Sequence, residues 1–324
     1  MKKTLSVLLA LCLVLSVAAC AFADAAAKDG GSKITFTTGG EAGTYFGFGG
    51  VLAQKVSEVT STDVTAITSG GSAANIDALD MGDAQIGFSQ SDVLSYAYEG
   101  VRSFEDLGAI NNFSIVAPLY MEQVQIVTMN PEIKTVADLA GKAVSIGAAG
   151  SGVYFNAIDV LGAYGLTEDD IKPTYQSFAD SAEALQDGQI DAAFIVAGAP
   201  TTAVTSLATT NSVFLVSLDD EHIDELIANS PFYAKAVIPA DTYKMPEDAT
   251  TVAVSAVVIA ADDVADTDVY NFLFGVFENL DALAQIHDKA NELSLEFASS
   301  FAGVPYHSGA VAYFADKGIT VEGK

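Results

Sequence analysis

The sequence predicts an α/β protein made of two lobes, in which parallel strands alternate with helices. A length of 324 residues is too great for one ordinary core and suits two lobes of about 150 residues each. Hydrophobic residues make up 50% of the chain and charged residues 17%, so the chain can bury a sizeable interior. Short β-branched runs alternate with amphipathic stretches, which is the order of parallel strands joined by crossover helices.

Residues 1–23 are typical of a secretory signal peptide. Lys2 and Lys3 precede an apolar run over 5–19 that is too short to span a membrane. Two processing sites compete: a lipobox that ends at Cys20, which would be acylated, and an A-x-A site that releases Asp24. We favour the lipobox, so the protein is expected outside the cytoplasm, in the periplasm or on the outer face of the cytoplasmic membrane. Cys12 and Cys20 are the only cysteines, so the mature domain has no disulfide.

The elements of the first lobe follow a small, polar tether over 24–33. The pattern then predicts strands over 34–38, 64–68 and 85–89, with helices over 45–59 and 73–80 between them. Two further strands, 113–118 and 123–129, mark a crossing point between the lobes.

A second round of elements begins at residue 143. It predicts strands over 143–147, 172–176, 192–197 and 213–216, with helices over 154–164, 181–187 and 201–209. Another strand follows over 251–260, and the chain is helical from 269. We therefore assign 34–118 plus 251–324 to lobe 1 and 119–250 to lobe 2 and the hinge crossings. The segments 113–129 and 237–256 are the expected hinge.

An internal repeat supports two similar lobes. The first strand leads into the glycine-rich run 39–43 before Tyr45-Phe46, and the strand at 143 leads into the glycine-rich run 147–152 before Tyr154-Phe155. The sequence Ala78-Leu79-x-x-Gly82, followed by Phe88, recurs as Ala184-Leu185-x-x-Gly188, followed by Phe194. Helix-turn-strand units look alike in any α/β protein, but two matches in the same order favour a shared lobe architecture.

Each glycine-rich turn lies between a strand and the start of a helix. Glycine lets the backbone approach a ligand, and the free N–H groups of the first helical turn attract anions. The hydroxyl groups of Thr44 and Ser151 stand where they would cap the helix or donate to the ligand. Of each Tyr-Phe pair, one ring is expected to pack inward and the other to face the cleft. Two such turns facing each other would form a two-sided anion site.

The residues that nucleotide binding, catalysis and metal binding require are not found in the expected patterns. Neither turn carries the lysine of a P-loop or the spacing of a dinucleotide fingerprint, so no cofactor is expected. No nucleophile elbow or H-E-x-x-H motif occurs, and His222, His287 and His307 are read as surface or packing residues, so no catalytic residue is assigned. The acidic run 262–268 lacks the glycine and closing glutamate of a calcium loop, so no metal is expected. With 14 Lys and Arg against 42 Asp and Glu, the net charge of −28 excludes nucleic acid and anionic membranes as partners.

Six motifs spread over the mature chain resemble those of the TAXI family, the solute receptors of one class of TRAP transporters. They are Thr38-Gly39-Gly40-x-x-Gly43-Thr44-Tyr45-Phe46, Ser69-Gly70-Gly71-Ser72-x-x-Asn75, Gly147-x-x-Gly150-Ser151-Gly152, Val196-Ala197-Gly198-Ala199-Pro200-Thr201, Ile238-Pro239-Ala240-x-Thr242-Tyr243 and Val304-Pro305-Tyr306-His307-x-Gly309-Ala310. The resemblance implies a type II periplasmic-binding-protein fold, two α/β lobes joined by hinge strands with a ligand cleft between them.

The resemblance also implies the function and the site. The receptor would bind a small anionic solute, such as glutamate, glutamine or a related dicarboxylate, and dock on a sodium-coupled TRAP permease. Carried over by position, the ligand-binding candidates are Gly40, Thr44, Tyr45, Asn75, Gln90, Ser151, Gly152, Val153, Ala197, Gly198 and Pro200. Two departures are Val153, where many relatives carry threonine, and Gly47, where many carry proline.

We therefore predict a solute-binding receptor of a TRAP-type importer, a monomer that touches the membrane only through a lipid anchor at Cys20. The alternative is the ligand-sensing component of a signalling system, in which the closed lobes dock on a kinase, and an exported enzyme is the third reading. Arg102 is the only arginine and lies away from both glycine turns in sequence. Backbone and side-chain dipoles, and no guanidinium, are therefore expected to hold the solute.

Overall fold

The computed structural model describes residues 26–324, and the leader with Cys20 lies outside these residues. Within them, ten strands form one mixed sheet in the order β2-β1-β3-β10-β4-β7-β5-β6, with β8 beside β4 and β9 beside β10. The strands are β1 Lys33–Thr37, β2 Asp63–Ile67, β3 Ile86–Gln90, β4 Phe113–Thr128, β5 Ala143–Ser145, β6 Lys172–Thr174, β7 Ala192–Ala197, β8 Phe214–Leu215, β9 Ala234–Ile238 and β10 Ala249–Ala261.

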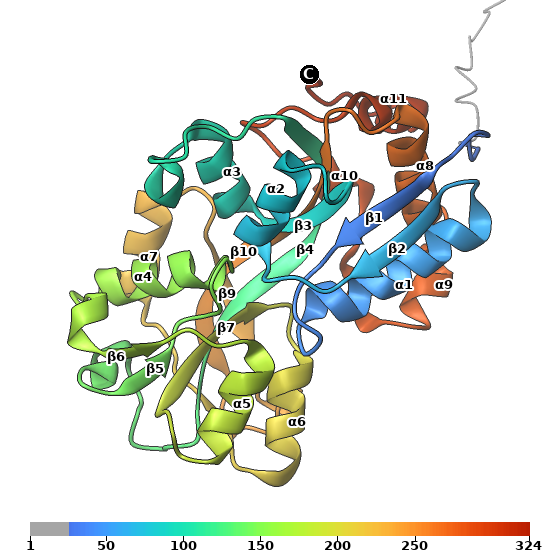
Figure 1. The fold of residues 1–324 in the computed structure, drawn as a ribbon. Helices are drawn as coiled ribbons and strands as arrows, with labels where there is room; N and C mark the ends of the chain where they lie inside the picture. The colour runs from blue at the N-terminus through green and yellow to red at the C-terminus, as the bar shows by residue number, and fades with distance from the viewer. Residues whose placement is uncertain (1–25) are drawn as a thin grey trace, which may run out of the picture.

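Helices cover both parts of this sheet (Figure 1). The α-helices are α1 Thr44–Val59, α2 Ser72–Asp80, α3 Ser91–Glu99, α4 Val153–Ala163, α5 Phe178–Gln186, α6 Thr202–Thr210, α7 Asp220–Asn229, α8 Asp266–Phe277, α9 Leu280–Ala284, α10 Leu295–Ala298 and α11 Ser308–Asp316. Short 3₁₀ helices include η1 Arg102–Phe104 and η5 Asp288–Glu292. Across residues 26–324, no helix has the length and apolar character to cross a membrane.

Lobe 1 forms around β1, which pairs in parallel with β2 and β3. Its core takes residues from both ends of the chain: Phe36 of β1, Phe88 of β3 and Phe272 of α8 are fully buried, and the Phe36 ring contacts the other two rings. Helix α8 therefore packs on the sheet from the C-terminal part of the chain, which makes lobe 1 discontinuous in sequence. In Figure 1 the blue strands and the orange helices form this one body.

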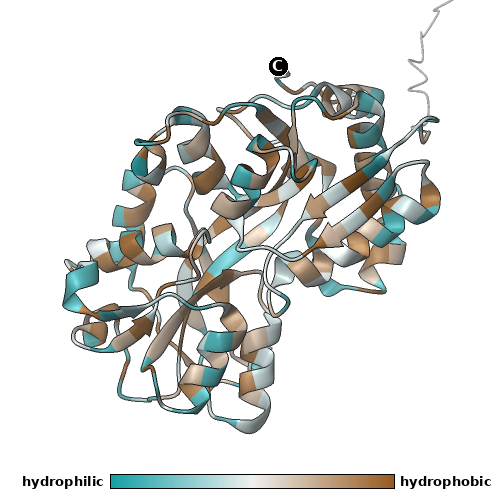
Figure 2. Cartoon of the chain, in the orientation of Figure 1, coloured by the Kyte–Doolittle hydropathy of each residue, from teal (hydrophilic) through white to brown (hydrophobic). Residues whose placement is uncertain are grey.

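Lobe 2 repeats the plan of lobe 1. Strand β5 pairs in parallel with β6 and β7, as β1 does with β2 and β3. Apolar clusters lie on the two faces of this sheet: Phe194 belongs to the cluster that contains α4, and Ile195 belongs to the cluster that contains α6. The alternation of β7 side chains between the two clusters follows from the two-residue period of a strand. In Figure 2 the helices of this lobe carry both brown and teal residues.

Two long antiparallel strands, β4 and β10, pass between the lobes. The first half of β4 pairs with the second half of β10, and the second half of β4 pairs with β7 of lobe 2. The prediction of two separate strands over 113–118 and 123–129 was wrong, because the intervening residues continue one strand of 16 residues. Register shifts between Ala256 and Val257 and between Val258 and Ile259 interrupt the pairing near the crossing, where bulges bend and twist a strand.

The segment before β1 is docked on lobe 1, so the expected free tether is wrong for its second half. Backbone N–H of Lys28 donates to Asn271 Oδ1 at 2.7 Å, and backbone N–H of Ser32 donates to Asp268 Oδ1 at 2.8 Å. Asp268 is buried and also accepts from the hydroxyl groups of Ser32 at 2.6 Å and Thr62 at 2.7 Å. The small polar residues of this segment therefore serve as partners of α8.

We expect Asp268→Ala to destabilise the protein by about 3 kcal/mol, because it removes three hydrogen bonds and leaves their donors without a partner. Urea unfolding measures this free energy. Asp281→Ala is the matched control, since Asp281 is an exposed carboxylate on α9, and a change within about 0.5 kcal/mol is expected. Equal effects of the two substitutions would contradict the docking of this segment.

Candidate functional site

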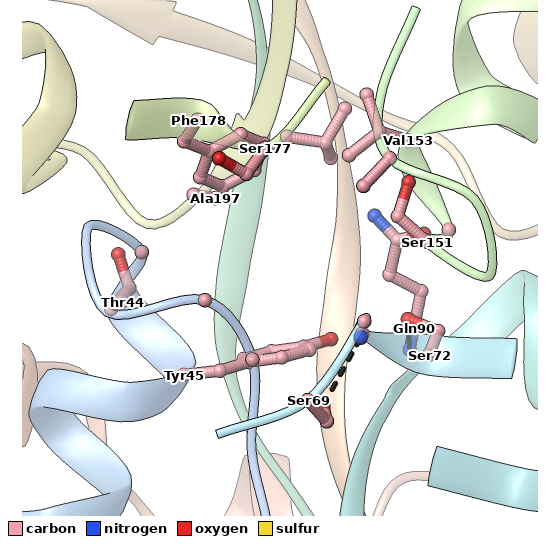
Figure 3. Close-up of a pocket in the computed structure, with 18 of the residues that line it drawn as sticks. Thr44, Tyr45, Ser69, Ser72, Gln90, Ser151, Val153, Ser177, Phe178 and Ala197 are labelled. Carbon is pink, nitrogen blue, oxygen red and sulfur yellow. Dashed lines mark hydrogen bonds between the residues drawn. The ribbon is translucent and has the colours of Figure 1, made fainter. Parts of the chain in front are cut away.

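A cavity of about 90 Å³ lies between the two lobes (Figure 3). Its wall takes residues from the loops before four helices and from strands β3, β4 and β7. The lining residues are Gly39, Gly40, Gly43, Thr44, Tyr45, Ser69, Gly70, Gly71, Ser72, Gln90, Glu122, Ala148, Ser151, Gly152, Val153, Gln176, Ser177, Phe178, Val196 and Ala197. None of them is a lysine, an arginine or a histidine, and Glu122 is the only one with an acidic side chain.

The N-termini of four helices meet at this cavity: α1 and α2 from lobe 1, and α4 and α5 from lobe 2. The N-cap residues of α1, α2 and α4 are Gly43, Gly71 and Gly152, which have no side chain to cap the first turn. First-turn N–H groups have no partner within their own helix and carry partial positive charge. The glycine caps therefore leave the N–H groups of the first two residues of α1, α2 and α4 without a side-chain cap, whereas Ala74 N–H of α2 already donates to Gly150 O. In α5, Ser177 caps its own helix by accepting from Asp180 N–H.

Side-chain donors and acceptors of the wall add to these amides. Ser151 Oγ and Gln90 Oε1 are buried and have no hydrogen-bond partner within residues 26–324. Gln90 Nε2 donates to Asn156 Oδ1 of α4 at 3.0 Å, and Asn156 Nδ2 donates to Asp92 Oδ2 at 2.9 Å. The first contact joins a cavity residue of lobe 1 to a helix of lobe 2. The position of the Gln90 side chain in the cavity wall therefore depends on how closely the two lobes approach each other.

Glu122 contributes the one carboxyl group of the wall. It lies on β4, is 2% exposed, and accepts from the Tyr45 hydroxyl at 2.7 Å through Oε2. Burial raises the pKa of Glu122 to about 8, because a charged carboxylate is poorly solvated there. Burial together with the neighbouring Glu122 also holds the pKa of Tyr45 well above its usual value. At neutral pH the wall is therefore uncharged.

The structure brings most of the predicted site residues to this cavity. Those in the wall are Gly40, Thr44, Tyr45, Gln90, Ser151, Gly152, Val153 and Ala197. Asn75 lies below it and uses its side chain to bond Thr37 Oγ1 and the backbone carbonyls of Thr38 and Phe88. Gly198 and Pro200 lie outside the wall, and Gly198 O accepts from Thr44 Oγ1 at 2.9 Å. The Thr44 hydroxyl therefore joins the two lobes, and its proton is not free for a solute.

The Tyr-Phe pairs behave differently in the two lobes. Tyr45 reaches the cavity and stacks on Phe88, with ring centroids 4.5 Å apart. Neither Tyr154 nor Phe155 lines it, although α4, like α1, begins one residue before its Tyr; Ser151, Gly152 and Val153 form this part of the wall instead. The expectation that each pair sends one ring into the cleft holds for lobe 1 only.

Sequence reasoning missed Glu122 and the start of α5. A glutamate within the apolar run of β4 was the available signal for Glu122, since a buried strand rarely carries an isolated carboxyl. For α5, the Ser177-x-x-Asp180 spacing is a capping signal. The structure also contains α3 and α7, for which no helix was predicted.

The lobes touch each other directly around the cavity. Ala74 N–H donates to Gly150 O at 3.1 Å, and Ala203 N–H donates to Ala42 O at 3.1 Å. A Cβ atom at Gly152 would lie 1.7 Å from Gln90 Oε1 and 2.9 Å from Ser72 Oγ. A side chain at this position would therefore have to displace the Gln90 amide group from its present place between the lobes.

Arg102 lies outside the cavity wall and joins the lobes instead. Its guanidinium donates to both carboxylate oxygens of Asp159 on α4, at 2.7 and 3.1 Å, and to the Tyr96 hydroxyl at 3.1 Å. The Tyr233 hydroxyl donates to Asp159 Oδ2 at 2.9 Å. The only arginine of the chain is thus committed to an interlobe ion pair.

The histidines and the acidic clusters of residues 26–324 form no metal site. Within the described residues, no group of three or more His, Cys, Asp or Glu is arranged to hold a metal ion. His307 is buried beneath the start of α11, and burial lowers its pKa. His222 pairs with Asp219 on the surface, and this contact lowers the pKa of Asp219 to about 2.

Comparisons with known proteins identify the fold and a family. The model of the NMT1-like family matches residues 36–318. The alkanesulfonate-binding protein SsuA from Xanthomonas axonopodis pv. citri, solved with MOPS, is 16% identical, with 91% of this chain and 92% of that chain covered and a TM-score of 0.50. A ligand-binding component of an ABC-type import system from Staphylococcus aureus is 11% identical, with 89% and 92% covered and a TM-score of 0.53. The predicted type II periplasmic-binding-protein fold is confirmed.

We expect Gly152→Ala to hold the lobes apart, because the added methyl group must displace Gln90 from Asn156. Small-angle scattering should show a larger radius of gyration than for the unsubstituted protein. Gly162→Ala in the same helix is the control, since a Cβ there meets no atom within 4 Å. An unchanged radius for Gly152→Ala would mean that the wall adapts without opening.

A double-mutant cycle of Arg102→Gln and Asp159→Asn is expected to give a coupling energy of about 1 kcal/mol, since the pair is bidentate but partly exposed. Urea unfolding of the four proteins measures it. Purely additive effects would show that Arg102 contributes nothing to holding the lobes together.

Proposed function

The chain belongs to the NMT1-like family, and from this premise we propose that it is an extracytoplasmic solute receptor that captures a small anionic solute between its lobes. The proposal includes the finer assignment made from the sequence motifs, a receptor of a TAXI-type TRAP transporter. Its solute is glutamate, glutamine or a related dicarboxylate, and its partners are the membrane subunits of a sodium-coupled permease. The predicted leader supports a location outside the cytoplasm.

One observation carries this proposal: four helix N-termini meet at one cavity between the lobes that no cationic side chain lines. A helix N-terminus stabilises an anion by about 0.3–2 kcal/mol, according to burial. Each hydrogen bond to a charged carboxylate contributes about 1.5–3 kcal/mol. Four or five such bonds reach the roughly 8 kcal/mol of micromolar binding before ordering costs are subtracted. An anion can therefore be held without arginine.

The arrangement supports binding and gives no support to turnover. The wall offers donors from backbone amides and from Ser151, whereas a nucleophile paired with a base is not among its residues. The two crossing strands give the lobes a path to open and admit the solute, as in hinge closure. A solute enclosed by both lobes would then fix one surface for the permease.

Thermal unfolding with a panel of acids tests the proposal. Mature protein, unfolded and refolded to remove carried-over ligand, is expected to gain about 2.7 kcal/mol at a ligand concentration one hundred times Kd. The panel contains L-glutamate, L-glutamine, glutarate, succinate and 2-oxoglutarate, with L-lysine as a cationic control. If only L-lysine stabilised the protein, or if none of the acids did, the proposal of an anion receptor would be refuted.

Substitution of one wall residue locates the binding site. Ser151→Ala is expected to lower the affinity for the acid that binds best by about tenfold to a hundredfold, because one charge-assisted hydrogen bond is lost. Ser230→Ala is the matched control, because Ser230 Oγ is also buried without a partner but lies outside the wall. Equal losses for both variants would place the solute elsewhere.

A further inference from the structure

We propose that Glu122 determines which solute is bound by acting as a neutral carboxylic acid, whose Oε1 hydroxyl donates a hydrogen bond to an oxygen of the solute anion. This inference rests on the proposed function and deepens it. The acid takes the place that a cationic side chain would fill in an anion site, and its proton stays on Glu122 when the solute binds. No covalent bond forms or breaks.

The two carboxyl oxygens of Glu122 have different surroundings. Oε2 accepts from the Tyr45 hydroxyl at 2.7 Å, whereas Oε1 has no hydrogen bond to any described residue. Oε1 is not fully enclosed by the protein, and Glu122 lines the cavity. Tyr45 therefore fixes the carboxyl plane, and Oε1 is the oxygen left for a ligand.

The groups that face Glu122 explain why it holds a proton. Asp92 of α3 repels the carboxylate and raises its pKa, Tyr45 of α1 donates to it and lowers the pKa, and Lys289 of η5 lowers it more weakly. The Lys289 ammonium is paired with Glu292 and lies 5.7 Å from the centre of the Tyr120 ring. Burial outweighs both lowering effects, so the pKa lies at about 8. An anion in the cavity would raise it further.

The sign of the pH dependence follows from this. The unliganded carboxyl of Glu122 is mostly protonated well below pH 8, so its own titration changes affinity little there. Above that pH the proton must be taken up on binding, and affinity falls about tenfold per pH unit until the pKa of the complex is reached. Carboxylic acid solutes are fully ionised over this range. Their own titration does not contribute to the profile.

Isothermal titration calorimetry with glutarate, at pH 6.5, 8 and 9.5, tests the inference. Glutarate has no amino group. L-glutamate, which has one, is measured at pH 6.5 and 8 as the matched comparison. The native chain is expected to bind glutarate with proton uptake at pH 9.5 and with about 15-fold lower affinity than at pH 8. Glu122→Gln, which keeps the shape and an N–H donor, is expected to bind equally at all three pH values. Glu132→Gln, an exposed glutamate, should retain the native pH profile.

Other results overturn the inference. A glutarate affinity of the native chain that does not change with pH would show that Glu122 makes no protonated contact. Binding of L-glutamate alone, with proton release and a large loss in Glu122→Gln, would show an ionised Glu122 that pairs with the solute ammonium. If no acid of the panel binds, the anion site is wrong and this inference falls with it, whereas binding with a flat profile overturns the inference alone.

Discussion

Four helix N-termini aimed at one small cavity are the constraint on which the rest of the structure depends. Their partial positive charges repel one another, so the lobes can approach only if other contacts offset this repulsion. The hydrogen bonds from Ala74 to Gly150 and from Thr44 to Gly198 do so beside the cavity, and the Arg102–Asp159 pair does so at its periphery. A bound anion would remove the repulsion itself, which couples closure to binding.

Glycine at the N-caps serves this arrangement in two ways. Gly43, Gly71 and Gly152 leave the first-turn amides uncapped, and Gly152 also lets lobe 2 come against Gln90. Gly71 adopts φ = 108°, a conformation that residues with a side chain rarely take. Close approach and free donors therefore depend on the same residues, and a larger side chain would disturb both.

A strongly acidic protein that binds an anion must keep its own charges away from the site. The net charge is −28, yet the wall contains only one acidic residue, and burial keeps that residue neutral near pH 7. Asp92 and Asp159 lie behind the wall, where Asn156, Tyr233 and Arg102 hold them in hydrogen bonds. Neutral dipoles at the site, together with the Asp159–Arg102 ion pair behind it, make binding of an anion compatible with the overall charge.

The sequence by itself determined the two α/β lobes, the repeat that relates them and the glycine turns, because strand and helix periods, glycine and cap chemistry are local properties. Eight of the eleven site residues that the family resemblance implied lie in the wall. Only the tertiary structure decided that Asn75 supports a loop, that Arg102 joins the lobes, and that Glu122 lies between them. Each of these depends on a partner from a distant segment: Phe88 for Asn75, Asp159 for Arg102 and Tyr45 for Glu122. Such pairings arise when the crossing strands bring the lobes together, and no local pattern specifies them.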